Sequence, residues 1–325
     1  MTKIFITGGA GYVGTVLTEM LLKKNYQVTV LDLMIYGDNI ENNNKLNKIY
    51  GDIRNVELLK KVLPGHQIVI HLACISNDPS FELNPTLGKS INYDSFKDLL
   101  NISKKSGIHK FIYASSSSVY GIKKEKKVVE DMQLEPLTDY SKYKALCEEI
   151  LIKDKSKNFV KIILRPATVC GYSKRQRLDL VLNILTNLAY HKREIQVFGG
   201  SQLRPNIHIK DMCKAYISLM EAPSDLVNNQ VFNVGFENFS VAELASMVKS
   251  NIGNDVKIIE KTTNDMRSYH VSSDKIKKLI KFNTEKSLVD AVIDLKKVFE
   301  LKLLNDPLNN ENYFNIKKMQ KIKLL

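Results

Sequence analysis

A tyrosine and a lysine stand four residues apart in the segment Asp139-Tyr-Ser-Lys-Tyr-Lys144. Residues spaced i and i+4 share one face of a helix, so Tyr140 and Lys144 are expected to point the same way. Free tyrosine has a pKa of about 10, which is too high for a base at neutral pH. A nearby ammonium favours the phenolate and lowers that pKa. The pair is therefore a candidate for exchanging a proton with a substrate hydroxyl.

Two more motifs precede this pair. The first, Thr7-Gly-Gly-Ala-Gly-Tyr-Val-Gly14, follows a predicted strand and opens a predicted helix. Glycines at such a turn let the backbone approach a pyrophosphate, and the helix N-terminus supplies unpaired N–H groups. The second, Ala114-Ser-Ser-Ser-Ser-Val-Tyr-Gly121, offers hydroxyls that can hydrogen-bond the substrate oxygen. In this order, the three motifs predict an enzyme that moves a hydride and a proton together.

Asp32 ends the next predicted strand after the glycine motif. A carboxylate at that point accepts hydrogen bonds from a ribose diol and repels a 2′-phosphate. Leu33 follows it, and not the arginine that would favour that phosphate. The sequence therefore favours NAD over NADP, with a plain strand-end turn as the alternative role of Asp32.

The composition narrows the class of protein. The 325 residues, 44% of them hydrophobic, suffice for a packed core. No run of about 18 apolar residues predicts a transmembrane helix, and the start lacks a secretory signal, so a cytoplasmic protein is expected. The four cysteines are scattered without a CxxC pair or Cys/His cluster, so no metal site is expected. The net charge of +13 comes from dispersed basic residues, so no nucleic-acid partner is predicted, although the charge can attract an anionic substrate.

Strand and helix patterns alternate over Lys3–Pro166. This alternation predicts an α/β fold with a mostly parallel, doubly wound sheet of the Rossmann type. A long helix is expected over Pro85–Ser106, ended by Gly107, and another over Asp139–Asp154. The pattern then loosens into a smaller mixed α/β C-terminal subdomain. Residues from Asn305 onward are polar and are expected to be loosely ordered.

From Lys3 to about Phe282, the chain resembles the extended short-chain dehydrogenase/reductase family, in its NAD-dependent nucleotide-sugar epimerase and dehydratase branch. The resemblance implies that Ser116 is the catalytic serine. It makes Tyr140 the base and acid, and Lys144 its partner. The residues that it assigns to NAD binding are Gly8, Gly11, Tyr12, Val13, Gly14, Asp32, Asp52, Ile53, Leu72, Ala73, Cys74, Asn92, Tyr140, Lys144 and Ala167.

The same resemblance implies a nucleoside-diphosphate sugar as the substrate. Arg204 matches the arginine that this branch places on the diphosphate, where a guanidinium fork suits phosphate oxygens. The predicted substrate-binding residues are Ser76, Asn77, Ser116, Ser117, Ser118, Thr168, Arg177, Arg204 and Arg267, with Arg175 as a further candidate. For Asn77 the alternative is a turn built on Asn-Asp-Pro, and for Arg267 it is a solvated surface arginine.

Two interleaved parts are expected. Residues 1–166 would form the NAD-binding Rossmann domain, with returning segments near 203–222 and 230–236, and residues 167–325 the nucleotide-sugar-binding subdomain. The resemblance implies a homodimer in which Pro85–Ser106 and Asp139–Asp154 of two copies form a four-helix bundle. The apolar positions of the first helix agree with this pairing, but they also agree with packing on the protein's own sheet: Ile91, Leu99, Leu100 and Ile102.

Departures from the family pattern narrow the reaction. Dehydratases of this branch carry an acidic residue just after the catalytic serine or threonine, whereas Ser117 and Ser118 stand here, so a 4,6-dehydratase is disfavoured. The first hypothesis is an epimerase of polysaccharide biosynthesis, which oxidises a sugar hydroxyl, with C4 as the expected carbon, to a transient ketone and reduces it again. A 4-dehydrogenase or 4-reductase acting on a GDP- or UDP-sugar or heptose stays open. A non-catalytic NAD-sensing or RNA-associated protein is the alternative from another class.

Overall fold

A seven-stranded sheet forms the centre of the computed structural model, which describes residues 1–123, 125, 127–263 and 270–322. The strand order is β10-β6-β5-β4-β1-β2-β3, and every pairing is parallel. The strands are β1 (Lys3–Thr7), β2 (Gln27–Asp32), β3 (Leu46–Tyr50), β4 (Ile68–His71), β5 (Lys110–Ala114), β6 (Val160–Pro166) and β10 (Gln230–Val234). The order reverses between β1 and β4, which confirms the predicted doubly wound sheet of the Rossmann type.

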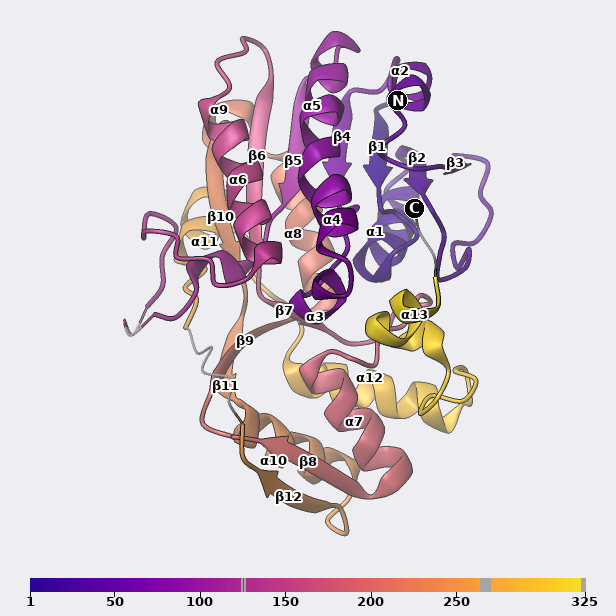
Figure 1. The fold of residues 1–325 in the computed structure, drawn as a ribbon, viewed down its shortest axis with the longest axis vertical. Coiled ribbons are helices and arrows are strands. Elements are labelled where there is room, and N and C mark those ends of the chain that lie inside the picture. The colour runs from indigo at the N-terminus through magenta and orange to yellow at the C-terminus, as the bar shows by residue number, and fades with distance from the viewer. Residues whose placement is uncertain (124, 126, 264–269, 323–325) are drawn as a thin grey trace.

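Helices cover both faces of this sheet (Figure 1). Successive residues of β1 enter opposite cores, because side chains alternate along a strand. Ile4 and Ile6 pack with the helices of one face, and Phe5 packs with those of the other. The first face carries α1 (Tyr12–Lys23) and α8 (Ile209–Glu221), and the second carries α2 (Val56–Val62), α5 (Ser95–Lys105) and α6 (Asp139–Lys153). Shorter helices α9 (Ser224–Val227) and α11 (Asp274–Ile280) pack near β6 and β10.

The chain after β6 builds a second group of elements at the carboxyl end of the sheet (Figure 1). A three-stranded sheet has the order β11-β9-β7, and β8 pairs in parallel with β12. These strands are β7 (Thr168–Cys170), β8 (Glu194–Phe198), β9 (Leu203–His208), β11 (Glu237–Ser240) and β12 (Lys257–Lys261), and the helices packed with them are α7 (Val181–Lys192), α10 (Val241–Ile252) and α12 (Leu288–Glu300). Between these elements, α8 and β10 return to the large sheet.

The helix expected over Pro85–Ser106 has three consecutive parts. These are α4 (Pro85–Lys89), a π-helical turn (Ser90–Asp94) and α5, which ends before Gly107 as predicted. Within the wide turn, Asn92 accepts a hydrogen bond from the Ile75 N–H at 2.8 Å and donates one to the Ile75 carbonyl at 3.0 Å. Four apolar residues of this segment were compatible either with a dimer bundle or with packing on the protein's own sheet. All four are buried in the protein's own core, namely Ile91, Leu99, Leu100 and Ile102.

The expectation of loose order after Asn305 is wrong for the described residues. A 3-10 turn (Glu311–Tyr313) and helix α13 (Asn315–Lys321) follow, and α13 lies beside α3 (Asp78–Glu82). Tyr313 and Phe314 pack on a buried cluster formed by Leu178, Leu295, Val298, Phe299 and Leu304. The polar composition of this segment concealed the two aromatic side chains that hold it in place.

Two further expectations concern what the described chain lacks. None of its helices is long and apolar enough to cross a membrane. Within the same residues, no group of three His, Cys, Asp or Glu side chains is arranged to hold a metal ion. The four cysteines are free thiols.

A buried ion pair ties α6 to β6 and yields a test of stability. Glu148 and Arg165 are both almost fully buried, and Arg165 Nη2 lies 2.6 Å from Glu148 Oε2. Replacing Glu148 by Ala leaves a buried guanidinium without its carboxylate, so the free energy of unfolding should fall by about 3–5 kcal/mol. Urea denaturation measures this change.

The neighbouring Glu149 is the matched control. It lies on the same helix, is exposed, and pairs with Lys153 one turn later. Glu149→Ala should change the free energy of unfolding by less than about 0.5 kcal/mol. Equal urea midpoints for the two variants would show that the buried pair does not stabilise the sheet.

Candidate active site

The glycine motif turns tightly between β1 and α1. Gly8 has φ of +75°, and a Cβ atom there would lie 2.6 Å from the backbone nitrogen of Ala73. A Cβ at Gly14 would lie 2.3 Å from the carbonyl oxygen of Gly8. Gly11 is the N-cap of α1 and supplies no side-chain acceptor to the first N–H groups of the helix. The turn therefore leaves the first N–H groups of α1 without a side-chain cap, as a phosphate site requires.

Asp32, at the end of β2, stands beside this turn. Its carboxylate accepts hydrogen bonds from the Ala10 N–H at 3.0 Å and from the Met34 N–H at 2.7 Å. Burial raises the pKa of Asp32, while these two N–H groups and Arg175 oppose the rise. At the next strand end, Asp52 accepts hydrogen bonds from Arg54, with Nη2 to Oδ2 at 2.7 Å. Both carboxylates line the same cavity.

The catalytic candidates come from the segment that follows β5 and from α6. Ser116 precedes the 3-10 turn Ser117–Tyr120, and its Oγ accepts from the Ser118 N–H at 3.1 Å. Tyr140 lies in the first turn of α6 and Lys144 one turn later, as the i, i+4 spacing predicts. Lys144 Nζ donates to the Ala114 carbonyl at 2.6 Å and lies 5.8 Å from the centre of the Tyr140 ring.

The surroundings of Tyr140 favour the protonated phenol. Burial raises the pKa of Tyr140 well above its usual value, and Cys74 and Asp78 add to the rise. A hydrogen bond with Ser116 and the charge of Arg177 lower the same pKa. These protein groups therefore leave Tyr140 protonated at neutral pH, with its proton ready for donation to a neighbouring oxygen.

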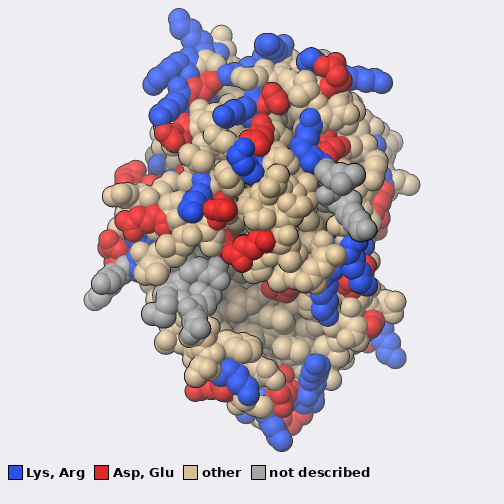
Figure 2. All heavy atoms as spheres, viewed as in Figure 1, with Lys and Arg blue, Asp and Glu red and all other residues tan. Residues whose placement is uncertain are grey.

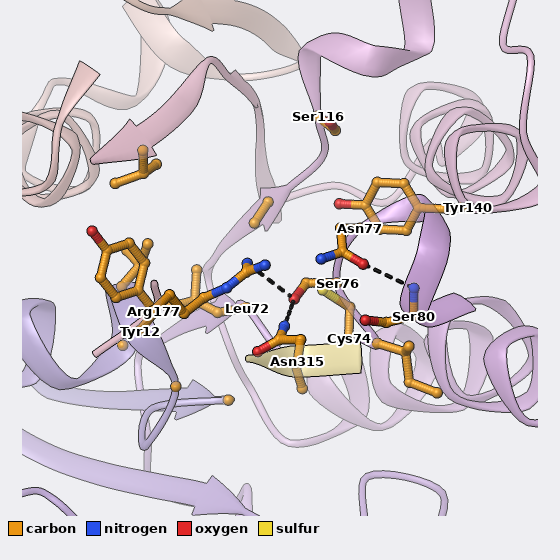
Figure 3. Close-up of a pocket in the computed structure, with 18 of the residues that line it drawn as sticks. Tyr12, Leu72, Cys74, Ser76, Asn77, Ser80, Ser116, Tyr140, Arg177 and Asn315 are labelled. Carbon is orange, nitrogen blue, oxygen red and sulfur yellow. Dashed lines mark hydrogen bonds between the residues drawn. The ribbon is translucent and has the colours of Figure 1, made fainter. Parts of the chain in front are cut away.

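Polar side chains face Tyr140 across the cavity (Figure 3). Arg177 binds Asp179 with its guanidinium fork, at 2.8 and 3.1 Å. Asn77 has φ of +72° and caps α3, because its Oδ1 accepts from the Ser80 N–H at 2.9 Å. It therefore acts as a helix cap, in place of the turn named as its alternative role, and it also lines the cavity.

One cavity of about 560 Å³ brings most of the predicted residues together. Its volume lies within the range of ligand sites. Asn92 is not on its wall but beneath it, where it holds the backbone of Ile75, and Arg267 lies outside the described residues. The predicted residues on the wall are Gly8, Gly11, Tyr12, Val13, Gly14, Asp32, Asp52, Ile53, Leu72, Ala73, Cys74, Ser76, Asn77, Ser116, Ser117, Ser118, Tyr140, Lys144, Ala167, Thr168, Arg177 and Arg204.

Sequence reasoning missed part of the wall. Tyr36 was not named, and its ring centre lies 3.6 Å from the buried guanidinium of Arg175, the further candidate. Asn315, Ile316 and Met319 of α13 also line the cavity. Tyr36 could have been found as an aromatic residue shortly after Asp32, but no motif or spacing marks the C-terminal residues.

The fit of a dinucleotide can be judged from these residues alone. The glycine turn admits no Cβ at two of its positions, and the Asp32 carboxylate, predicted to bind a ribose, stands beside it. Arg175 Nε is buried and has no hydrogen-bond partner in the described part of the chain. Arg175 lines the cavity, so the wall contains a cationic donor that no described residue uses. A parallel sheet with these groups at its carboxyl edge defines a dinucleotide-dependent α/β enzyme.

Comparisons with known proteins agree with this class of protein. The model of the NAD dependent epimerase/dehydratase family matches residues 4–235. UDP-glucose 4-epimerase of Lactobacillus helveticus is 26% identical over 268 residues, which are 76% of this chain and 81% of that protein. The structure of UDP-glucose 4-epimerase of Thermotoga maritima with UDP-glucose has a TM-score of 0.84 at 24% identity, covering 93% of this chain and 100% of that chain. UDP-glucuronic acid 4-epimerase of Bacillus cereus, in complex with UDP-glucuronic acid and NAD, has a TM-score of 0.82 at 25% identity, with the same coverage.

The chain therefore belongs to the NAD dependent epimerase/dehydratase family, and NAD is its cofactor. The resemblance inferred from the sequence motifs is confirmed at the level of the family, the fold and the cofactor. The glycine turn and Asp32 are the residues that would hold the pyrophosphate and the adenosine ribose.

Replacing Asp32 by Ala tests its predicted contact with the adenosine ribose. Loss of a charged hydrogen-bond acceptor should weaken NAD binding by about 10- to 100-fold and reduce the preference for NAD over NADP. Calorimetric titration with both dinucleotides measures these affinities. Asp38→Ala is the control, because Asp38 lies in the following loop, pairs with Lys48 and is not on the cavity wall. An unchanged ratio of the two affinities in Asp32→Ala would refute the ribose contact.

Proposed function

We propose that this protein is an NAD-dependent UDP-sugar 4-epimerase. The observation that carries the proposal is the convergence of Ser116, Tyr140 and Lys144 on the cavity that also contains the glycine turn. The relatives and neighbouring structures named as UDP-glucose or UDP-glucuronic acid 4-epimerases support both the nucleotide and the reacting carbon. In this proposal, residues beyond Pro166 hold the sugar nucleotide, with Thr168 and Arg204 on the wall.

The proposed roles follow from the chemistry of the side chains. Tyr140 removes the proton from the C4 hydroxyl and later returns it to the same oxygen. Ser116 hydrogen-bonds that oxygen, and Lys144 Nζ lies 5.8 Å from the centre of the Tyr140 ring. Bound NAD supplies the hydride acceptor and donor. Since burial raises the pKa of Tyr140, proton return is favourable and proton removal depends on Ser116 and the nearby positive charges.

Other reactions of the same residues are weaker proposals. A 4-dehydrogenase or 4-reductase would use Ser116 and Tyr140 in the same way, but it would release a product of changed oxidation state. A 4,6-dehydratase needs a carboxylate acid after the catalytic serine, where Ser117 and Ser118 stand. A regulatory NAD-binding or RNA-associated role would not need the serine, tyrosine and lysine to face one cavity. On the face shown in Figure 2, basic and acidic side chains are intermixed, which gives no support to a nucleic-acid partner.

The setting of the enzyme is part of the proposal. A cytoplasmic location agrees with four free thiols in the described chain. A place in polysaccharide biosynthesis follows from the proposed substrate class, because sugar nucleotides are the activated precursors of polysaccharides.

Turnover of a sugar-nucleotide panel tests the proposal. UDP-glucose, UDP-galactose and their GDP counterparts are incubated with the NAD-loaded protein, and C4 isomers and NADH are measured. We expect a C4 isomer of a UDP-sugar without net NADH. Accumulated NADH would instead identify a dehydrogenase, and no turnover of any sugar nucleotide would refute the proposed class.

Tyr140→Phe separates catalysis from cofactor binding in the same assay. Loss of the phenolic proton should lower turnover by at least about 1,000-fold while NAD stays bound. Tyr143→Phe is the control, since Tyr143 lies on the same helix, packs against Phe81 and Tyr93, and is not on the cavity wall. Comparable turnover in the two variants would remove Tyr140 from the mechanism.

We also propose the homodimer with a four-helix bundle. On the outer surface of α6, Leu146 and Ile152 are 37% and 40% exposed, and burying them against a second copy would stabilise a dimer. Leu146→Lys should therefore shift a dimer toward monomer in light-scattering measurements. Ile293→Lys on α12, where the native side chain is 50% exposed, should leave the dimer intact. A monomeric native protein would exclude this assembly.

A further inference from the structure

Helix α13 brings to the cavity a residue that lies beyond the family match, which ends at residue 235. Asn315 is 3% exposed although it belongs to a polar segment near the end of the described chain. Its backbone N–H donates to Asp179 at 2.8 Å, and its side chain contacts Arg175 and Ser76. Asn315 therefore joins three distant parts of the chain, namely α13, the segment Arg175–Asp179 and the loop that contains Ser76.

The partners of Asn315 determine which way its amide points. A guanidinium has only donors, so the carbonyl oxygen must face Arg175, and Arg175 Nη2 lies 2.7 Å from Asn315 Oδ1. This orientation leaves the amide nitrogen to donate to Ser76 Oγ at 2.9 Å. The assignment of oxygen and nitrogen follows from the chemistry of arginine and is not arbitrary.

Ser76 accepts from a second donor on its other side. Arg177 Nη1 lies 3.4 Å from Ser76 Oγ, a long contact (Figure 3). The Arg177 guanidinium fork is held by Asp179. A hydroxyl has two lone pairs and one proton, and both lone pairs here face N–H donors. In the described residues no group accepts the Ser76 proton, and Ser76 lines the cavity. The proton is thus left for a ligand in the cavity.

We propose that Asn315 is a positioning residue which, together with Arg177, makes Ser76 a hydrogen-bond donor toward an oxygen of the bound sugar. The inference rests on the proposed function and deepens it, because it names a specificity determinant of the sugar subsite. The favoured substrate is a sugar nucleotide whose sugar presents an acceptor oxygen at the Ser76 wall.

The anchoring of α13 makes this role possible. Leu178 N–H donates to the Tyr313 carbonyl at 2.8 Å, and Phe314 packs on the same cluster as Leu178. Ile316 and Met319 turn toward the cavity, while Lys317 is exposed. An amphipathic helix fixed at its start can hold a side-chain amide within hydrogen-bond tolerance.

The test replaces the donor by an acceptor without changing its shape. In Asn315→Asp, a carboxylate stands beside Arg175, which keeps the fold, but it accepts from Ser76 and takes the proton away from the ligand. The parent is Tyr140→Phe, in which turnover is stopped, saturated with NAD. The probes are UDP-glucose and UDP, and their dissociation constants are measured by calorimetry.

We expect Asn315→Asp to weaken UDP-glucose binding about tenfold and UDP binding less than about twofold. Ser76→Ala should have the same effect as Asn315→Asp, and the double variant should be no weaker than either single variant, because both remove one hydrogen bond. Gln320→Glu is the control, since it adds the same charge on the exposed side of α13. It should bind both probes as the parent does.

The outcomes distinguish this inference from the proposed function. Equal weakening for UDP and UDP-glucose would indicate general charge repulsion and would overturn the inference. Additive losses in the double variant, or UDP-glucose binding that Asn315→Asp leaves unchanged, would overturn it as well, with the proposed substrate class intact. A parent that binds neither probe would overturn both.

Discussion

The close approach of β1 and β4 at their carboxyl ends is the constraint on which the rest of the site depends. The two strands pair in parallel with Thr7 opposite His71, and Thr7 Oγ1 and His71 Nδ1 are 2.7 Å apart in the buried interior. Burial lowers the pKa of His71 to about 3, with a smaller contribution from Lys144, so the imidazole is neutral. Because the chain then passes directly from β1 over the backbone of Ala73, only a glycine fits at position 8.

This approach places two different kinds of group at one edge. The glycine turn carries the backbone groups predicted to bind a phosphate, and the segment after β4 carries Ser76 and Asn77 to the wall of the same cavity. Strands β5 and β6 end at the same edge, since parallel strands have a common direction. Lys144 reaches the Ala114 carbonyl at the end of β5, which holds the start of α6 and Tyr140 above the same cavity.

The parts of the site that could be predicted are those whose function shows in local spacing. Gly8 and Gly14 need a turn without Cβ atoms, and Tyr140 and Lys144 need one helical face, so a few adjacent letters suffice. Asn315 could not be found this way, because its role arises from contacts with residues about 140 and 239 positions earlier. The π-helical turn within the expected helix over Pro85–Ser106 could not be found for the same reason.

That helix contains a π-helical turn, in which Asn92 satisfies both backbone groups of Ile75. The helix propensity of this segment does not predict a hydrogen bond between Asn92 and the earlier loop that contains Ile75. The polar composition of the C-terminal segment led to the wrong prediction of loose order. Packing of two aromatic residues, Tyr313 and Phe314, on a buried cluster stabilises the segment despite its many lysines and asparagines. Tertiary contacts therefore decided the structure in both of these segments.

The arginines of the cavity show how burial and charge combine. Burial lowers the pKa of Arg175 to about 10, so the guanidinium remains charged at neutral pH. Arg177 has Asp179 as a full partner, whereas Arg175 is stabilised by the Tyr36 ring, the Asn315 amide and the more distant Asp32. Because no carboxylate of the described residues is paired directly with Arg175 as Asp179 is with Arg177, its positive charge can attract an anionic ligand. Asn315 of α13 supplies the remaining contact of the guanidinium. The last described helix therefore links the buried Arg175 cation to the Ser76 hydroxyl on the cavity wall, which makes the C-terminal segment part of the cavity and not an appendage to it.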